Sequence, residues 1–392
     1  MIMATGVVSI GSDLKRKSWM REGLIQASSE SFWTPITGNT KDAVVYQENN
    51  ENSSAGHTVV FDYDGNLSGK GVKGKDTAFG KGEQKKKFSD KITVERYRLV
   101  VDNGDKFDGV DIGDLSINEH SDSRAKLGDL FTRFKDQALF DAAQGNLLTN
   151  DDGIQAPSHV IDLGTTFNFN TLVDIEKILR TSQGFSTGGM RRPLDPYKAS
   201  RGQNGIHGNL PVWIFLIDSA MAGLLRKDVA GYQTIMKDAD VRGQNNRNIQ
   251  GIFGNIGRLM IVEAGHFFGE TEGTTSGWEL SASEIEICGL RQYSGADPTT
   301  ALWTGQEGFD ENAANLHSRG AILGRSALQL AMGKQPDYKH QASQDFGIKT
   351  ESAVEFWMET RKCHLKAENK KYKKAKVSEL DYGVISVDLG IV

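Results

Sequence analysis

Two strand-like segments that flank a glycine- and lysine-rich loop constrain this chain more than any other feature. Residues 57–63 (HTVVFDY) place Val59, Phe61 and Tyr63 on one face of an extended strand. Residues 90–101 (DKITVERYRLVV) form a second candidate strand. The pattern predicts a long two-stranded hairpin over residues 55–98 with a flexible cationic tip. Because an isolated hairpin is marginal in water, we expect this one to lie against another chain.

The second strand changes the phase of its apolar alternation part-way along. Ile92 and Val94 share one face, but the apolar residues from Tyr97 onward fall on the opposite phase. Such a slip predicts a bulge or a change of packing partner near Glu95-Arg96.

The loop also contains a G-x-G-x-x-G pattern, which runs from Gly69 to Gly74. A P-loop would carry Ser or Thr after Lys75, where this chain has Asp76. A phosphate loop also needs a helix directly after it, and residues 75–88 show no apolar period of 3.6. The hairpin tip is therefore the preferred interpretation, and a nucleotide-binding enzyme using the Gly69–Gly74 loop is an alternative.

Composition and motif searches give no indication of metal or cofactor chemistry. The 392 residues carry a net charge of −5, and 38% of them are hydrophobic, which is ordinary for a soluble chain of two or three packed units. Cys288 and Cys363 lie far apart, and the eight histidines form no zinc motif. Residues 62–66 (DYDGN) begin like a calcium loop, but Leu67 occupies the position of the loop glycine and no Glu lies at its twelfth position. We predict no catalytic residues, no cofactor and no metal.

The sequence also lacks the marks of a membrane or secreted protein. No uncharged apolar run approaches the roughly 18 residues that a transmembrane helix needs. The N-terminus is apolar before it is basic, which is the reverse of a signal peptide. We therefore expect a reducing, aqueous compartment.

A long helix is predicted over residues 116–145. Ser116 and Glu119 form a capping box, apolar residues recur at helical spacing, and Gly145 is a natural stop. About 28 residues at about 1.5 Å each give a helix about 40 Å long, suited to a structural spine. Other expected elements are a helix over 170–183, a buried strand over 210–217 followed by a helix capped by Asp218, strands over 257–263 and 283–288, a helix over 311–333, and strands over 352–365 and 382–389.

Near the C-terminus, eight basic residues and a single acid, Glu368, lie between Arg361 and Lys376, with Tyr372 among them. One interpretation is a surface that contacts a phosphate backbone. The other is a solvated turn that joins the last two strands. The eight basic residues are Arg361, Lys362, Lys366, Lys370, Lys371, Lys373, Lys374 and Lys376.

An arm, a long hairpin, a spine helix, a mixed middle region and returning C-terminal strands follow one another in this chain. The segments that mark this order are Trp19 with Gly23-Leu24, Ser31-Phe-Trp33, Gly56–Phe61, the Gly69/Gly71/Gly74 tip leading to Gly82-Glu83, Phe134–Gly145, Gly320–Leu328 and Asp381–Ile385. The arrangement resembles the major capsid proteins of tailed bacteriophages, which share the HK97-like fold. It is most similar to the capsid family of the N4-like podoviruses.

This resemblance implies an α+β fold with four parts. Residues 1–54 would be an N-terminal arm, and residues 55–98 the extended loop. Residues 99–165 and 310–392 would form a peripheral domain around the spine helix. Residues 166–309 would form the axial domain.

The resemblance also implies a function and partners. The chain would be a major capsid protein without enzyme activity that assembles as pentamers and hexamers into an icosahedral phage head around double-stranded DNA. It would be made and assembled in the host cytoplasm and reside in the virion. The arm is short and lacks heptads, so a separate scaffolding protein is implied, with a portal protein, a decoration protein and non-specifically bound DNA as further partners and no membrane. A cellular shell protein of the encapsulin type is the alternative.

The resemblance places inter-subunit contacts in the arm and at the hairpin tip. The glycines would let one loop bend to fit different neighbours in pentamers and hexamers. Some relatives crosslink lysines of this loop to asparagines of a neighbour, and plain electrostatic contact is the alternative. The candidates are Trp19, Trp33, Gly69, Lys70, Gly71, Lys73, Gly74 and Lys75.

Overall fold

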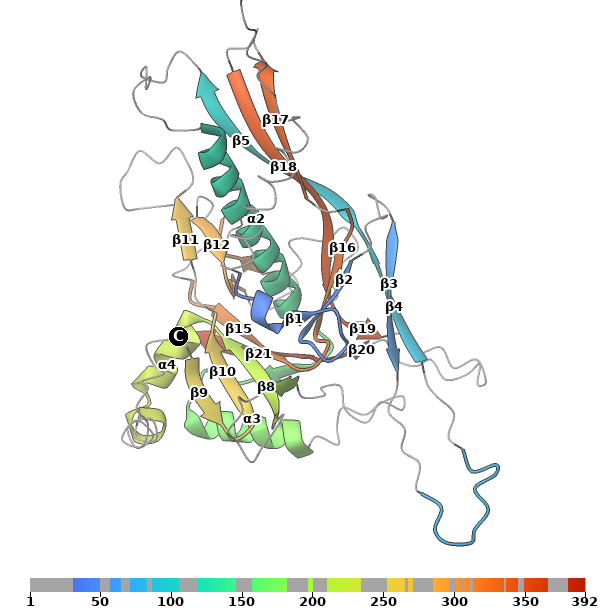
Figure 1. The fold of residues 1–392 in the computed structure, drawn as a ribbon. Helices are drawn as coiled ribbons and strands as arrows, with labels where there is room; N and C mark the ends of the chain where they lie inside the picture. Colours follow the sequence, from blue (N-terminus) through green and yellow to red (C-terminus); the bar gives the residue numbers. More distant parts are fainter. Residues whose placement is uncertain are drawn as a thin grey trace, which may run out of the picture.

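The fold is that of a computed structural model, which describes the chain in several stretches. These are residues 31–49, 57–64, 71–82, 87–105, 119–145, 157–181, 197–199, 210–233, 252–264, 267–270, 285–295, 301–304, 306, 308–309, 313–334, 336–344, 349–365 and 380–391. Two sheets lie on either side of one long helix, and all three contribute residues to one hydrophobic core (Figure 1).

The long helix, α2 (Glu119–Gln144), packs along a six-stranded sheet (Figure 1). The strand order is β1 (Thr37–Gly38), β2 (Val45–Asn49), β16 (Leu328–Met332), β18 (Lys349–Lys362) and β17 (Asp337–Gln344), and β5 (Glu95–Asp105) also pairs with β18. The rings of Phe131 and Phe134 lie 4.7 Å and 5.5 Å from the ring of Phe356 on β18. Helix α2 therefore buries its aromatic stripe against this sheet.

A nine-stranded sheet forms the second unit. Its order is β14 (Leu302–Trp303), β13 (Gln292–Ser294), β15 (Leu316–Leu323), β8 (Leu210–Ile217), β10 (Leu259–Glu263) and β9 (Ile252–Ile256). Strand β21 (Val384–Ile391) pairs with β15 and with β6 (Val160–Asp162), and β7 (Tyr197–Ala199) pairs with β8.

Strand β8 is apolar throughout because both faces of its sheet are covered. Trp213, Phe215 and Ile217 pack in one cluster with α3 (Phe169–Thr181) and α4 (Ser219–Lys227). Ile214 and Leu216 pack in the other cluster, together with residues of α2. The sheet thus lies between α2 on one face and α3 and α4 on the other.

Smaller elements complete the described chain. The hairpin strands β3 (Thr58–Asp64) and β4 (Lys87–Thr93) pair antiparallel from Thr58 with Thr93 to Asp64 with Lys87. Strands β11 (Phe267–Glu270) and β12 (Ile285–Cys288) pair, as do β19 (His364–Leu365) and β20 (Leu380–Asp381). Short helical turns span Thr34–Ile36 (η1) and Val229–Gln233 (η2).

Several expectations from sequence are confirmed. The expected helices over 116–145 and 170–183 correspond to α2 and α3, and the strand over 210–217 is β8. Asp218 caps α4 by accepting a hydrogen bond of 2.9 Å from the main-chain nitrogen of Met221. The phase slip marks a change of partner, because β4 pairs with β3 whereas β5, from Glu95 onward, pairs with β18.

The helix expected over residues 311–333 is wrong. This segment forms strands β15 and β16, joined by a turn at Arg325-Ser326. Almost every residue of both strands is buried, so leucines appear at many spacings and imitate a helical stripe. Gly320 also fits a strand inside a tight core, since a Cβ there would lie 2.7 Å from the carbonyl oxygen of Leu216.

Candidate assembly surfaces and their supports

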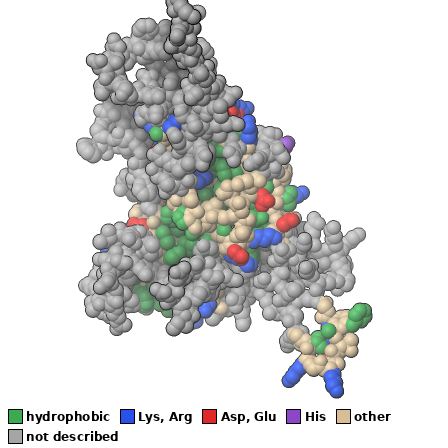
Figure 2. Space-filling view, in the orientation of Figure 1, with side chains coloured by type: hydrophobic (Ala, Val, Ile, Leu, Met, Phe, Trp, Pro, Cys, Tyr) green, Lys and Arg blue, Asp and Glu red, His purple; other side chains and the backbone are tan. Residues whose placement is uncertain are grey.

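The hairpin tip is the most exposed part of the described chain. All residues from 71 to 82 are exposed, and in Figures 1 and 2 they extend away from the body. Gly71, Lys73, Gly74 and Lys75 lie here, and Gly74 has a φ of +69°. Residues 71–82 form no helix and the next described element is β4, so the described residues do not include the helix that a phosphate loop needs. Gly69 and Lys70 lie outside the described residues.

The strands of the hairpin, in contrast, pack on their own subunit. Val59, Phe61, Tyr63 and Ile92 are buried, and the ring of Phe61 lies 5.2 Å from the ring of Tyr46 on β2. The expectation that the whole hairpin needs another chain is therefore wrong. Each paired arm is seven residues long, and one face of it is covered by the body. The other face of the strands, with Val60 47% exposed, and the tip remain uncovered.

A buried polar cluster holds the base of this hairpin. Asp90 of β4 accepts a hydrogen bond of 3.1 Å from the main-chain nitrogen of His364. Asp381 contacts the Lys362 ammonium at 2.7 Å and the His364 ring at 3.1 Å. It also accepts a hydrogen bond of 2.8 Å from the main-chain nitrogen of Ser158. These contacts tie β4, β18, β19 and β20 together beneath the tip.

The charges of this cluster are set by burial and by hydrogen bonds. Burial lowers the pKa of Lys362, against the attraction of Asp381. Burial alone would raise the pKa of Asp381, but the contacts from His364 and Lys362 outweigh it and lower that pKa. Beside them, burial raises the pKa of the Cys363 thiol. Lys362 and Asp381 therefore form a structural ion pair, because both of their side chains are about 98–99% buried.

The structure corrects part of the prediction that a basic cluster near the C-terminus faces DNA. Lys362 is directed inward to Asp381 and is not exposed to any polyanion. Arg361 is half-buried, and its guanidinium lies 3.5 Å from the carbonyl oxygen of Lys91. The other six residues, Lys366, Lys370, Lys371, Lys373, Lys374 and Lys376, lie outside the described residues.

The N-terminal arm is fixed on α2 by Asp136. Its carboxylate accepts hydrogen bonds from the Ser31 hydroxyl (2.6 Å) and from the main-chain nitrogen of Phe32 (2.7 Å). Burial raises the pKa of Asp136, against these hydrogen bonds. The Trp33 indole donates to the Asp136 carbonyl oxygen at 3.2 Å and packs 4.9 Å from the ring of Phe140.

The inter-subunit role expected for Trp33 is therefore wrong for its side chain. The side chain is 0% exposed within its own chain, where it fills the core between the arm and α2. Trp19 lies outside the described residues. The arm is anchored at residues 31–33 on α2.

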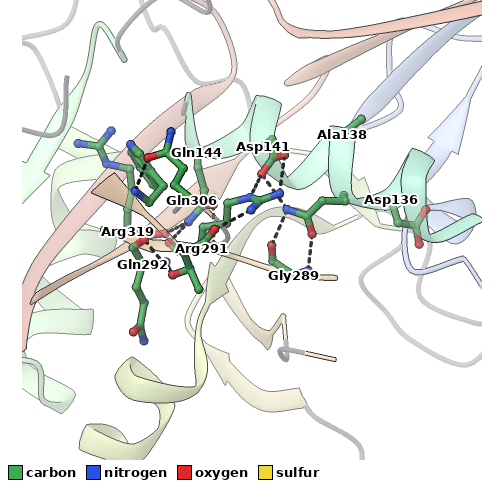
Figure 3. Close-up of polar contacts among 12 residues, drawn as sticks. Asp136, Ala138, Asp141, Gln144, Gly289, Arg291, Gln292, Gln306 and Arg319 are labelled. Atoms are coloured by element: carbon green, nitrogen blue, oxygen red, sulfur yellow. Dashed lines mark hydrogen bonds and ion pairs between the residues drawn. The ribbon is translucent and has the colours of Figure 1, made fainter. Parts of the chain in front are cut away.

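A second set of polar side chains joins α2 to the strands of the nine-stranded sheet (Figure 3). Gln137 accepts from the main-chain nitrogen of Gly289 at 2.8 Å and donates to its carbonyl oxygen at 3.2 Å. Gln144 accepts from the main-chain nitrogen of Arg291 at 2.8 Å. It also donates to the carbonyl oxygens of Arg291 (2.8 Å) and Arg319 (2.7 Å). Asp141, between them, contacts the Arg291 guanidinium at 2.8 Å.

Arg319 extends this network into the sheet. Its guanidinium pairs with both oxygens of Asp388 at 2.5 Å and 2.7 Å. It also lies 5.3 Å from the ring centre of Tyr293 and 5.6 Å from that of Trp303. The two units are thus joined by hydrogen bonds with fixed directions in addition to apolar packing, which favours one relative orientation.

Sequence reasoning missed this network, although one signal was present. Positions 137, 141 and 144 of α2 follow the i, i+4, i+7 spacing of one helix face, and all three carry polar residues. A polar stripe beside apolar residues on a long helix indicates a satisfied buried network as readily as a solvated face. Their partners, 147 to 175 residues away, are not visible in the sequence.

The described residues hold no group of three or more His, Cys, Asp or Glu side chains arranged to bind a metal ion. Among those same residues, no helix combines the length and the apolar character that a membrane span requires.

Comparison with known proteins shows where this architecture occurs. Residues 7–172 match the family model of the phage capsid protein. The chain is similar to the capsid of Ralstonia phage GP4, with 18% identity, a TM-score of 0.61, and coverage of 100% of this chain and 98% of that chain. No curated protein sequence gave a significant match.

Two Helicobacter pylori phage structures agree. For the head structure of bacteriophage KHP40 the identity is 16% and the TM-score 0.62, with 93% and 91% of the two chains covered. For the acidic stable capsid of bacteriophage KHP30 the identity is 17% and the TM-score 0.61, with 92% and 91% covered. The chain thus shares the HK97-like fold of these phage capsids along almost its whole length, and within it residues 7–172 match the phage capsid protein family.

Proposed function

We propose that this chain is a major capsid protein, which assembles as hexamers and pentamers into an icosahedral phage head that encloses double-stranded DNA. The observation that carries the proposal is the contrast within the hairpin. Its strands are fixed to the body by Phe61 and by the Asp90–His364 contact, whereas residues 71–82 are all exposed. A rigid base with a bare tip suits a contact with a neighbouring copy.

A closed shell needs this kind of contact. Head-to-tail contacts between identical subunits close into rings, and a second contact type joins rings into a shell. Each subunit then needs several interfaces, and arms and loops supply area that a compact body lacks. Glycine positions such as Gly74 and Gly80, both at positive φ, let one loop adjust to different neighbours.

We further propose the division of labour that the resemblance implies. Residues 1–54 act as the arm and residues 55–98 as the extended loop. Residues 99–165 with 310–392 form the peripheral domain around α2, and residues 166–309 form the axial domain. The polar network of Gln137, Asp141 and Gln144 supports this division, because it lies where α2 meets strands of the axial region.

The remaining partners also belong to the proposal. We expect a separate scaffolding protein, a portal protein, a decoration protein and non-specifically bound DNA, with assembly in the host cytoplasm. The lysine-rich loop near the C-terminus is a candidate for contact with DNA, without Lys362. We assign the chain no enzyme activity, and the N4-like podoviruses are the phage group that we propose for it.

Shortening the loop tests the proposal. Replacing residues 65–86 by Asn-Gly keeps the pairing of Asp64 with Lys87, because Asn-Gly favours a tight two-residue turn. We expect a folded, soluble subunit that forms no particles when examined by negative-stain electron microscopy. The control replaces the same residues by a glycine–serine loop of equal length, which separates loop length from loop chemistry. Normal particles from the shortened chain would contradict the role of the tip.

A further inference from the structure

One side chain on the tip differs from the other exposed apolar residues of the described chain. Phe79 is 96% exposed, whereas the next most exposed large apolar residue, Val229, is 60% exposed. Most of the others lie on strands and helices, and Val72, on the same tip as Phe79, is only 37% exposed. Figure 2 shows green apolar atoms and blue lysine atoms together at this projecting tip.

A turn displays this side chain. The main-chain nitrogen of Lys81 donates to the carbonyl oxygen of Ala78 at 3.2 Å, which closes a four-residue turn. Phe79 is its second residue, and Gly80 is its third, with a φ of +78°. A type II turn requires positive φ at the third position, where glycine is favoured. The glycine thus holds the turn that places the phenyl ring at the apex.

The charge of the loop indicates what it meets. From Asn66 to Phe88 the sequence carries seven lysines and two acidic residues, a formal charge of +5. The whole chain has a net charge of −5, so the remainder of each copy carries −10. The cationic loop is therefore attracted overall to another copy of the same chain, whose remainder is acidic. A DNA backbone would attract the lysines equally, but phosphates provide no apolar pocket for a bare phenyl ring.

We propose that Phe79 is the apolar anchor of the contact between subunits. The ring inserts into an apolar pocket on a neighbouring copy, and Lys73, Lys75 and Lys81 meet acidic residues around the pocket. The lysines increase the rate of encounter, whereas the buried ring determines how long the contact lasts. This inference rests on the proposed shell function, and it assigns the affinity of the tip to its aromatic residue and not to the glycines and lysines.

The first test compares Phe79→Ala with the matched tip variant Thr77→Ala and with the triple lysine variant Lys73→Gln/Lys75→Gln/Lys81→Gln. Light scattering measures the protein concentration at which particles begin to form, at low and at high salt. Burial of one phenylalanine side chain corresponds to a change of about 10- to 100-fold in that concentration. We expect this shift for Phe79→Ala at both salt concentrations, a salt-dependent shift for the lysine variant and none for Thr77→Ala. Assembly of Phe79→Ala at the wild-type threshold would overturn the proposal.

A second measurement identifies the occupant directly. Particles assembled with Phe79→p-benzoylphenylalanine are irradiated, and the products are separated on a denaturing gel. A covalent dimer of the chain supports the proposal, and a crosslink to DNA or within one chain overturns it. If the wild-type chain forms no particles under any condition, the proposed shell function is wrong. If the wild-type chain forms particles and Phe79→Ala forms them equally well, only the proposed role of Phe79 is wrong.

Discussion

Replacing Gln144 tests whether directional hydrogen bonds, and not apolar packing alone, join α2 to the nine-stranded sheet. The side chain is 0% exposed and makes three hydrogen bonds to the main chain of Arg291 and Arg319. Gln144→Leu keeps a similar volume but leaves the Arg291 N–H and at least one carbonyl without this partner. A buried group that loses its partner costs about 1–3 kcal/mol. After a partial offset from the apolar leucine, we expect the free energy of unfolding to fall by about 3 kcal/mol.

Urea unfolding of unassembled subunits measures this loss, and hydrogen exchange locates it. The control is Asp129→Leu on the same helix, where the Asp129 carboxylate is 48% exposed and paired with Arg133. We expect that change to stay within about 0.5 kcal/mol. In Gln144→Leu the amide of Arg291 should also exchange faster than in the wild type. A Gln144→Leu subunit as stable as the control, with unchanged exchange at Arg291, would refute the reasoning.

Three further changes probe other supports, with urea or thermal unfolding as the readout. Asp381→Asn should cost about 3–5 kcal/mol because Lys362 is left buried without its counter-charge. Lys362→Met combined with Asp381→Asn should cost much less, because the charge is removed while the Asn amide can still accept from the Ser158 nitrogen; equal losses would be inconsistent with this. Burial lowers the pKa of His159, so the unfolded chain binds more protons than the folded chain at acidic pH, and stability falls as pH drops below about 6.5. His159→Gln should weaken this pH dependence of the free energy of unfolding; an unchanged dependence would argue against a role of His159. Gly383→Ala should destabilise the fold, because Gly383 has a φ of +88° and a Cβ there would lie 2.8 Å from the turn between β15 and β16. Gly223→Ala should stabilise the fold by about 0.5–1 kcal/mol, because Gly223 lies in α4 with open space around it. A Gly383→Ala chain more stable than the Gly223→Ala chain would contradict the geometry.

Local patterns in the sequence predicted the elements whose causes are local. The phase slip near Glu95-Arg96 marked the change of partner between β4 and β5, and Asp218 marked the start of α4. Helix α2 followed from its apolar spacing and its stop at Gly145. Each of these depends on residues within a few positions of one another, where steric and hydrogen-bonding rules decide the outcome.

Features set by distant partners could not be predicted in the same way. In the sequence Lys362 is one lysine among several in a basic run, but in the fold its ammonium lies 2.7 Å from the carboxylate of Asp381. Trp33 looked like a free anchor on an arm, but its partner Asp136 lies 103 residues away. The apolar spacing of β15 and β16 predicts a helix, because burial on both faces removes the alternation that identifies a strand. The exposure of Phe79 likewise depends on where the tip projects.

Electron cryo-microscopy of the purified protein under assembling conditions tests the central claim most directly. We predict closed icosahedral particles built from hexamers and pentamers, with residues 71–82 of each copy lying on a second copy. Subunits that stay monomeric under all conditions, or particles in which this tip folds back on its own subunit, would contradict it.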